Sequence, residues 1–380
     1  MNQADAPARR VSVVLPAGID DPTRPSGGNT YDRRVCGELP GAGWQVDEHA
    51  VAGGWPRPAA AGRAELARTL RRLPDGAVVL LDGIVACAAP EIVVPEAARL
   101  RLAVLVHLPL ADETGLSPAL AAELDAAERA VLLAVPAVVA TSHWAAGRLV
   151  DHHGLDPGRV HVAVPGADLH PRAAGSGETP LLLCVASVTP RKGQLRLVEA
   201  LAGLAELPWN CACVGPLTQD PAYVTRLRET IGTTGLTGRV RLAGPQSGTE
   251  LDASYAAADL LVLASYAETY GMAVTEALAR GVPVLATAVG GLPEAVGRAP
   301  GGAVPGALVP AQDPAALTAA LRDWLTDPAV RDRWKAAAHR RREALDDWRT
   351  TTQDLARVLD ELRSRPVPLE QHSTEPWRTV

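Results

Sequence analysis

The chain has 380 residues, of which 47% are hydrophobic and 21% are charged, a composition typical of globular domains. This length favours two domains, because single domains mostly contain about 100–200 residues. A formal net charge of −6 and a pI of about 5.9 exclude the whole-chain basic field of a nucleic-acid-binding protein, although not a local basic patch.

Short apolar runs alternate with helix-length segments through the first half of the chain. The strands predicted there are Val11–Leu15, Gln45–Val51, Ala77–Leu81, Leu102–His107, Ala137–Ala140 and Val160–Val164. Helical patterns between them include Arg63–Leu73, Pro118–Leu133 and Trp144–His153. This alternation is typical of a parallel sheet with helices on both faces.

A linker is predicted at residues 170–180, which read HPRAAGSGETP. The alternation then resumes, with strands predicted at Leu181–Ala186, Asn210–Val214, Val240–Leu242, Leu260–Leu263 and Val282–Ala286. Helices are expected at Pro314–Leu325 and Ala329–Leu345, and helical sequence continues to about Arg363. Residues 366–380 contain three prolines and no periodicity, so we expect a disordered tail.

These elements predict an α/β protein with two Rossmann-like, doubly wound parallel-sheet domains. The expected boundaries are residues 1–172 and 178–345, followed by a helix over residues 346–365 that returns to the first domain. Two such domains hold ligands in the cleft between the carboxyl ends of their strands. Chemistry is therefore expected in the loops that directly follow strands.

The cysteines and the apolar segments indicate a cytoplasmic protein. Five scattered cysteines without a CxxC pair argue against a zinc site and favour reduced, buried thiols. Residues 1–10 lack the pattern of a signal peptide. The longest apolar stretch, Ala130–Thr141, contains Pro136 and is shorter than the roughly 20 residues that span a bilayer. Contact with a membrane surface remains compatible with the sequence.

Two glutamates, Glu268 and Glu276, are separated by seven residues in the segment ETYGMAVTE, directly after an apolar strand. Residues 274–280 are predicted to be helical, with Gly271 near the helix start, where free backbone amides are able to hold a diphosphate or a sugar hydroxyl. Glu276 would then lie one turn inside the helix and face the cleft. The alternative is a surface helix with two solvated acids.

A second candidate site is the segment VASVTPRKG, residues 185–193, which follows a predicted strand and opens a helix. A lysine at this point is able to neutralise a departing phosphate. Lys192 and Lys335 are the only lysines in the chain. The alternative is an exposed Arg191–Lys192 pair at a helix start.

Two further candidates lie in the first domain. His107 ends an apolar strand in the segment VHLP, so its side chain is expected in the cleft, although a structural histidine is the alternative. Gly27 and Gly28 follow the first strand and permit close approach of an anion before a helix begins, although a simple turn is also possible. The loop is not GxGxxG, which argues against a dinucleotide-dependent dehydrogenase.

The Glu268–Glu276 segment resembles the Glu-x7-Glu motif of retaining GT-B glycosyltransferases of family 4, group 1. This family includes bacterial mannosyltransferases and sucrose-synthase-like enzymes. The resemblance covers nearly the whole chain, with its specific motifs mostly in the second half. It implies a GT-B fold, in which two Rossmann-like domains face a central cleft. It also implies that Glu268 faces the donor sugar and that Glu276 holds the ribose hydroxyls of the nucleotide.

The segment around Lys192 is similar to the Gly-Arg-x4-Lys-Gly loop of that family, whose Arg and Lys bind the donor diphosphate. Ser187 stands at the arginine position and Ala186 at the glycine position, so Arg191 is expected to supply the missing charge. In the family, a His-x-Pro like that at His107 contacts the donor sugar, and the glycine-rich loop lines the acceptor and diphosphate side. Weaker matches at residues 141–142, 164–168 and 290–294 are interpreted as packing and loop geometry.

The resemblance therefore implies a catalytic set and a donor-binding set. The catalytic residues are Glu268, His107 and Lys192. The donor-binding residues are Glu276, Arg191, Ser187, Gly27, Gly28, Tyr270, Gly271, Met272, Ala273 and Val274.

The expected activity is that of a retaining hexosyltransferase, which moves a sugar from a UDP- or GDP-linked donor to an unidentified acceptor hydroxyl. No Asp-x-Asp occurs in the sequence, so we expect no metal at the diphosphate and no cofactor. Without a metal, basic side chains and backbone amides would bear the leaving-group charge. The alternatives are a non-catalytic nucleotide-sugar-binding protein of the same fold and a sugar-nucleotide epimerase.

Overall fold

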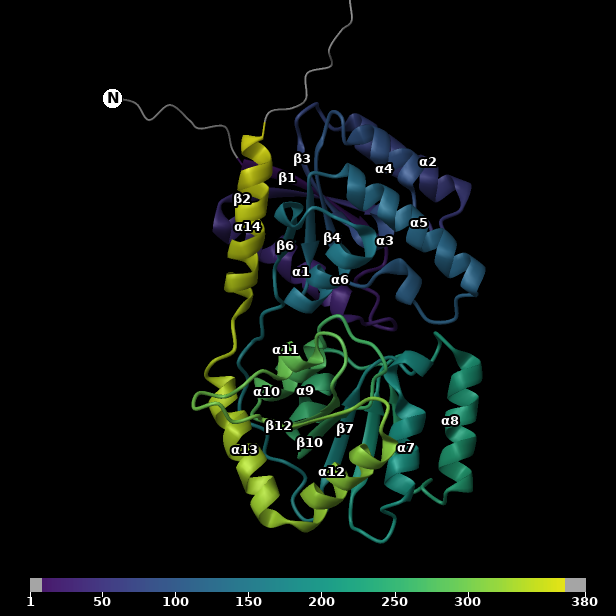
Figure 1. Cartoon of the computed structure of the whole chain (residues 1–380), viewed down its shortest axis with the longest axis vertical. Coiled ribbons are helices and arrows are strands. Elements are labelled where there is room, and N and C mark those ends of the chain that lie inside the picture. The colour runs from purple at the N-terminus through teal and green to yellow at the C-terminus, as the bar shows by residue number, and fades with distance from the viewer. Residues whose placement is uncertain (1–8, 366–380) are drawn as a thin grey trace, which may run out of the picture.

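The computed structural model describes residues 9–365, so the tail expected at residues 366–380 lies outside the described residues. The chain forms two lobes stacked along the long axis of the molecule (Figure 1). The N-terminal lobe contains strands β1–β6, and the C-terminal lobe contains strands β7–β12. The predicted α/β class with two doubly wound sheets is confirmed.

The N-terminal sheet has six parallel strands in the spatial order β2-β1-β3-β4-β5-β6. Their bounds are β1 (Arg9–Pro16), β2 (Trp44–Val51), β3 (Val78–Asp82), β4 (Arg101–Val106), β5 (Ala137–Ala140) and β6 (Val160–Val162). Strands β3 and β5 are buried along their whole length, as expected for a sheet covered on both faces.

The C-terminal sheet also has six parallel strands, in the order β12-β11-β10-β7-β8-β9. Their bounds are β7 (Leu181–Val185), β8 (Asn210–Val214), β9 (Val240–Gly244), β10 (Leu260–Leu263), β11 (Val284–Thr287) and β12 (Gly306–Val309). Strand β12 was not predicted, because its three apolar residues follow the glycine- and proline-rich segment at residues 300–306. It pairs with β11 along the edge of the sheet.

Helices cover both faces of each sheet. The α-helices of the N-terminal lobe are α1 (Gly27–Glu38), α2 (Ala60–Arg72), α3 (Gly83–Ala86), α4 (Pro90–Glu96), α5 (Pro118–Ala134) and α6 (His143–His153). Those of the C-terminal lobe are α7 (Gln194–Ala202), α8 (Pro221–Thr233), α9 (Gly248–Ala256), α10 (Met272–Leu278), α11 (Leu292–Val296), α12 (Pro314–Thr326) and α13 (Pro328–Arg342). Short 3-10 turns include η2 (Leu110–Asp112) and η4 (Pro190–Lys192).

Helix α14 (Trp348–Ser364) leaves the C-terminal lobe and packs along the N-terminal sheet (Figure 1). Its buried face includes Trp348, Leu355 and Leu359, which join the apolar cluster beneath β1, β3 and β4. Asp347 caps the helix by accepting a hydrogen bond from the Thr350 amide. Because α14 belongs in sequence to one lobe and packs on the other, it links the two lobes.

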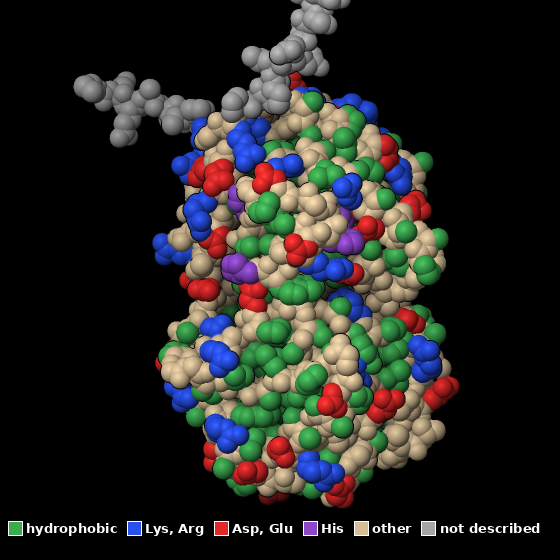
Figure 2. Space-filling model, viewed as in Figure 1, with side chains coloured by type: hydrophobic (Ala, Val, Ile, Leu, Met, Phe, Trp, Pro, Cys, Tyr) green, Lys and Arg blue, Asp and Glu red, His purple; other side chains and the backbone are tan. Residues whose placement is uncertain are grey.

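Each lobe has its own apolar core of mostly Leu, Val and Ala side chains. All five cysteines are buried, as expected, and none of them is in a disulfide in the part of the chain that the structure describes. Among the described residues, no helix is both long and apolar enough to span a membrane. On the face drawn in Figure 2, acidic and basic side chains are interspersed over both lobes rather than gathered by sign.

Candidate active site

A cavity of about 400 Å³ lies between the lobes, at the carboxyl ends of the strands of both sheets. Its volume is within the range of small-molecule sites. The loops after β1, β3 and β4 form the N-terminal wall, and the loops after β7, β8 and β10 form the C-terminal wall. The predicted site residues in its lining are Gly27, Gly28, His107, Ser187, Arg191, Lys192, Glu268, Tyr270, Gly271, Met272, Ala273 and Glu276.

Val274 is the one predicted site residue outside the lining. Its side chain is fully buried in the core of the C-terminal lobe. Its backbone N–H donates to the carbonyl oxygen of Gly271, and so it is already paired. The reason is helical geometry, since Val274 lies on the side of α10 that faces the sheet, whereas Glu276 faces the cavity.

Lys192 and Glu268 form a buried ion pair in the C-terminal wall. Lys192 Nζ donates to both carboxylate oxygens of Glu268, at 2.6 and 2.7 Å, and Ser265 Oγ donates to Oε1 at 3.0 Å. Burial acts to raise the pKa of Glu268, but Lys192 and Arg191 outweigh it and lower this pKa. Burial lowers the pKa of Lys192, which Glu268 partly offsets. The pair therefore keeps a carboxylate and an ammonium group at the cavity wall.

Arg191 lies beside this pair. Its Nη1 donates to the carbonyl oxygen of Ala267 at 3.3 Å and lies 3.9 Å from Glu268 Oε2. Its buried Nε has no hydrogen-bond partner within the described part of the chain. Ser187 lines the same wall, and its carbonyl oxygen accepts a bond from Gln194. The cationic side chains of the wall are thus Arg191 and Lys192 of the 3-10 turn η4. The uncharged Ser187 occupies the position at which the resemblance implies an arginine.

Glu276 lies further along the same wall. Its Oε2 accepts a hydrogen bond of 2.7 Å from the hydroxyl of Tyr255, which is fully buried. Burial raises the pKa of Tyr255 well above its usual range, and the adjacent carboxylate adds to this shift, so the phenol remains a donor. The guanidinium of Arg280 stacks on the Tyr255 ring at 4.7 Å. These contacts fix one oxygen of Glu276 and leave the other for a ligand.

On the N-terminal wall, His107 lies in front of two buried acids. His107 Nε2 is 2.9 Å from Asp32 Oδ1, and the polar atoms of Asp32, Asp82 and His107 lie within 4.8 Å of one another. Burial acts to lower the pKa of His107, but Asp32 and Asp82 outweigh it and raise this pKa to about 9. Burial and the neighbouring Asp32 raise the pKa of Asp82 to about 8. At neutral pH His107 is therefore an imidazolium and the carboxyl group of Asp82 is protonated.

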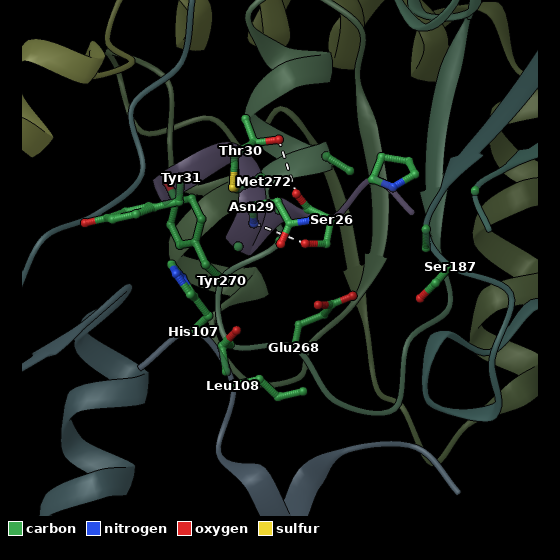
Figure 3. A pocket seen from close by; sticks show the side chains of 18 of the residues that line it. Ser26, Asn29, Thr30, Tyr31, His107, Leu108, Ser187, Glu268, Tyr270 and Met272 are labelled. Carbon is green, nitrogen blue, oxygen red and sulfur yellow. Dashed lines mark hydrogen bonds between the residues drawn. The ribbon is translucent and has the colours of Figure 1, made fainter. Parts of the chain in front are cut away.

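The glycines of the motifs allow close approach of backbone segments. A Cβ at Gly28 would lie 3.2 Å from the His107 ring, so α1 begins directly against that ring. A Cβ at Gly290 would lie 1.8 Å from the carbonyl oxygen of Glu268, which no side chain permits. Gly290 therefore holds the Glu268 loop in place, in agreement with the packing role expected for residues 290–294. In Figure 3, His107 and Leu108 approach the cavity from one wall and Glu268 and Ser187 from the other.

Direct hydrogen bonds join the lobes next to the cavity. Ser142 Oγ donates to the carbonyl oxygen of Thr269 at 2.6 Å and also caps α6. The carboxylate of Glu294 accepts bonds of 3.0 to 3.3 Å from the backbone N–H groups of His143 and Trp144, and His143 Nδ1 lies 2.9 Å away. The expected packing role of residues 141–142 and 290–294 thus includes contact across the cleft.

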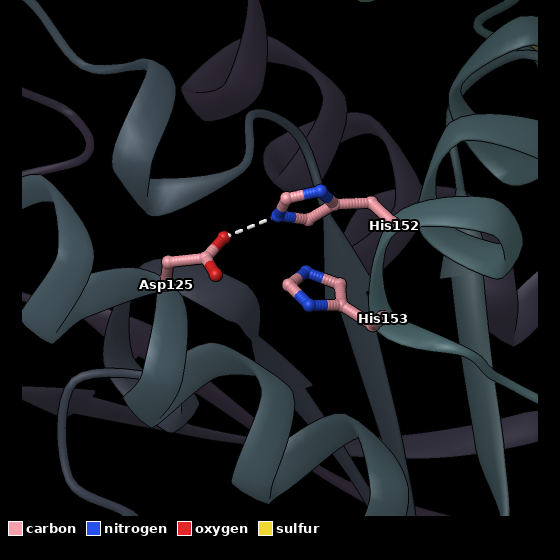
Figure 4. Close-up of side chains that lie close together, drawn as sticks. All are labelled: Asp125, His152 and His153. Carbon is pink, nitrogen blue, oxygen red and sulfur yellow. Dashed lines mark hydrogen bonds and ion pairs between the residues drawn. The ribbon is translucent and has the colours of Figure 1, made fainter.

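A second cluster of histidine and acidic side chains lies between α5 and α6, next to the segment that follows His107. His152 Nε2 is 2.6 Å from Asp125 Oδ1 (Figure 4). The buried His153 lies 3.1 Å from Glu128 Oε2. Glu128 also accepts a bond from the Leu110 amide in η2. These bonds fix the segment that follows His107 to two helices.

Several neighbours of the predicted residues were not anticipated from the sequence. The sequence contains a signal for Asp82, because this residue comes at the end of an apolar strand, as His107 does. Asp32 lies within α1, 75 residues before His107, and Tyr255 lies 21 residues before Glu276. No local pattern marks either residue as part of the site.

Residues 168–341 match the family described as Glycosyl transferases group 1. A D-inositol 3-phosphate glycosyltransferase from Salinispora tropica is 33% identical over 258 residues, which cover 62% of this chain and 52% of that protein. One from Kineococcus radiotolerans is 34% identical over 249 residues, which cover 60% of this chain and 57% of that protein. The chain thus spans about half the length of these curated relatives.

Solved structures share the whole two-lobed architecture. A sucrose-phosphate synthase from Thermosynechococcus elongatus aligns with a TM-score of 0.76 at 22% identity, over 93% of this chain and 99% of that one. HepE from Anabaena, solved in complex with UDP-glucose, aligns with a TM-score of 0.73 at 19% identity, over 93% and 99%. The two sheets and the cleft between them define the GT-B fold. Residues 168–341, which form most of the C-terminal lobe, therefore resemble a group 1 glycosyltransferase domain, in agreement with the resemblance of the Glu268–Glu276 and Lys192 motifs.

Proposed function

We propose that this protein is a retaining, metal-independent glycosyltransferase of family 4 that takes a hexose from a nucleotide-sugar donor. The main support is the position of Lys192 and Glu268 at the C-terminal wall of the cleft, opposite His107. Glycosyl transfer requires stabilisation of a leaving diphosphate and exclusion of water from an electron-deficient sugar carbon. A cleft between two lobes with basic side chains on one wall suits both requirements.

The donor diphosphate would bind at η4. Lys192 and Arg191 supply positive charge there. The diphosphate becomes more negative as the sugar–phosphate bond breaks, so these groups stabilise the transition state more than the ground state. Arg191 would take the place of the arginine that Ser187 replaces. The free oxygen of Glu276 would accept a hydrogen bond from the ribose, because Tyr255 already occupies its partner oxygen.

The sugar would lie between Glu268 and His107. An acceptor hydroxyl would attack from the face that the diphosphate leaves, and a phosphate oxygen would receive its proton, so that the anomeric configuration is retained. His107 would contact the sugar from the N-terminal wall, with Asp32 fixing its ring. The donor is UDP- or GDP-linked in this proposal, and HepE, which shares the fold, was solved with UDP-glucose.

The test combines binding with product analysis. Thermal-shift titrations with UDP, GDP and their sugars identify the donor, because a ligand of the folded state raises the midpoint. Turnover is then followed in excess chelator, and the anomeric configuration of the product is read by NMR. Binding without turnover with any acceptor would favour a non-catalytic protein, and sugar conversion without an acceptor would favour an epimerase. Inversion, or activity that requires added Mg²⁺, would contradict the mechanism.

A further inference from the structure

Among residues 9–365, no Lys or Arg side chain lines the N-terminal wall of the cavity, where the acceptor would bind. The lining residues of that lobe run from Pro16 to Pro165 and include the imidazole of His107, whereas the Lys and Arg side chains of the lining, Arg191 and Lys192, belong to the C-terminal lobe. Arginine and lysine are the side chains that recognise phosphate groups in proteins. The wall therefore offers no guanidinium or ammonium group to a phosphorylated acceptor, and its groups directed at an anion are the backbone amides at the start of α1.

Apolar side chains form much of this wall. They include Pro16, Pro56, Ile84, Leu108 and Leu110. Ile84 and Leu110 are continuous with the apolar core of the N-terminal lobe, which packs behind them. Such a surface favours a ligand with an apolar body, because contact removes apolar area from water.

The charged side chains of the wall supply no free cation to an anionic ligand. Glu113 lines the wall and adds negative charge. The ring of His107 is already paired with Asp32 at 2.9 Å, so its charge is met within the protein. Thr141 Oγ1 is a buried hydroxyl in the lining, and it has no hydrogen-bond partner among residues 9–365. This hydroxyl is able to bind an uncharged hydroxyl of a ligand.

We propose that the acceptor is a hydroxyl-bearing molecule with an apolar body and without a phosphate or other anionic group. The proposal rests on the glycosyltransferase function given above and adds the chemical class of the acceptor. It separates this chain from the relatives named for D-inositol 3-phosphate. A phosphate against Glu113 and the apolar wall would lose its hydration without gaining a cationic partner.

Two matched acceptor pairs test the proposal, with the preferred nucleotide bound. The first pair is octyl and methyl β-D-glucoside, and the second is myo-inositol and D-myo-inositol 3-phosphate. We expect the octyl glucoside to bind at least about tenfold more tightly than the methyl glucoside, because seven additional methylene groups meet the apolar wall. The phosphate ester should bind more weakly than its parent alcohol. Calorimetry gives the affinities, and release of the nucleotide from its sugar gives the rates.

A variant that adds a cation to the wall provides the reciprocal test. Ile84→Arg places a cation in the wall and should raise the affinity for the phosphate ester about tenfold, whereas Glu113→Gln, which only removes a charge, should raise it less. Glu113→Lys serves the same purpose if Ile84→Arg does not fold. Tighter binding of the phosphate ester than of the alcohol by the unmodified protein would overturn the acceptor class. Nucleotide affinity, measured in parallel, reports the donor site. A protein that binds no nucleotide would contradict the proposed function rather than the acceptor class.

Discussion

Lys192 Nζ lies 2.6 Å from Glu268 Oε1 and thereby joins two motifs that are 76 residues apart in the sequence. Both side chains are largely buried, with exposures of 14% and 8%. A buried charge that loses its partner is strongly destabilising. The pair therefore fixes the positions of both side chains in the C-terminal wall before any ligand binds.

Lys192→Met should lower turnover by about a hundredfold, because it removes a charge that meets the leaving diphosphate. It should also destabilise the protein, since Glu268 is left buried and unpaired. Adding Glu268→Gln to this variant should restore part of the lost stability, with a coupling energy of about 0.5–3 kcal/mol. Denaturant unfolding of the single and double variants measures the coupling. Strictly additive stabilities would show that the ion pair is not formed.

Arg191→Ala should damage turnover about as much as Lys192→Met, if Arg191 compensates for the missing arginine at Ser187. The reciprocal change, Ser187→Arg, should restore activity to the Arg191→Ala variant, because both positions line the same wall. Steady-state kinetics of the three variants decide this. A near-neutral Arg191→Ala would mean that the guanidinium is only structural and would strengthen the non-catalytic alternative.

Glu276→Ala should weaken nucleotide binding roughly tenfold or more, because a hydrogen bond to a charged group typically contributes about 1.5–3 kcal/mol. The control is Tyr255→Phe, which removes the hydroxyl that holds Glu276 Oε2 and leaves the carboxylate in place. This control should cost less affinity than loss of the carboxylate. Calorimetry with the free nucleotide separates the two variants. Unchanged affinity in Glu276→Ala would exclude the ribose contact.

The Asp32–Asp82–His107 cluster predicts that the free energy of unfolding falls as the pH rises from about 4 to 9. The pKa of Asp82 is about 8 and that of His107 about 9 in the folded protein, both above their unfolded values of roughly 3.9 and 6.5. The folded state thus binds more protons in this window. The stabilisation is complete below the unfolded pKa values and is lost as the pH passes the folded ones.

Asp82→Asn should make this fall shallower, because the amide imitates the protonated carboxyl and can still cap α3 at the Ile84 amide. Asp151→Asn, at an exposed position of α6, is the matched control and should leave the slope unchanged. Denaturant unfolding at several pH values gives the slopes. Equal slopes for Asp82→Asn and the unmodified protein would show that Asp82 is ionised throughout.

Much of the fold was predictable because its signals are local. Apolar runs of strand length mark all but one of the twelve strands, and the site residues follow strands directly. The exception, β12, begins with a glycine and lies between prolines at positions 305 and 310, so its three apolar residues do not read as a strand. The supporting contacts were not predictable, because Tyr255, Asp32 and Glu294 meet their partners only after the helices and lobes have packed. A side-chain pair across the cleft depends on lobe orientation, which no periodicity encodes.

Glu294 gives the clearest case of such a contact, because its carboxylate binds the N-terminal end of α6 across the cleft. Ser142, next to it, binds the carbonyl oxygen of Thr269, which directly follows Glu268. These bonds stabilise the approach of the lobes at the point where the donor sugar would lie. Glu294→Ala should therefore shift the protein toward a more open arrangement and raise the KM for the donor.

A hydrogen bond to a charged group typically contributes about 1.5–3 kcal/mol. Loss of that stabilisation of the closed arrangement should raise the KM for the donor about tenfold. Small-angle scattering of the free protein should show a larger radius of gyration for Glu294→Ala, and saturating nucleotide should reverse the change, because binding across the cleft favours closure. Glu229→Ala, an exposed carboxylate on α8, is the control for loss of charge. An unchanged radius together with an unchanged KM would mean that α14 and the other interlobe contacts hold the lobes without Glu294.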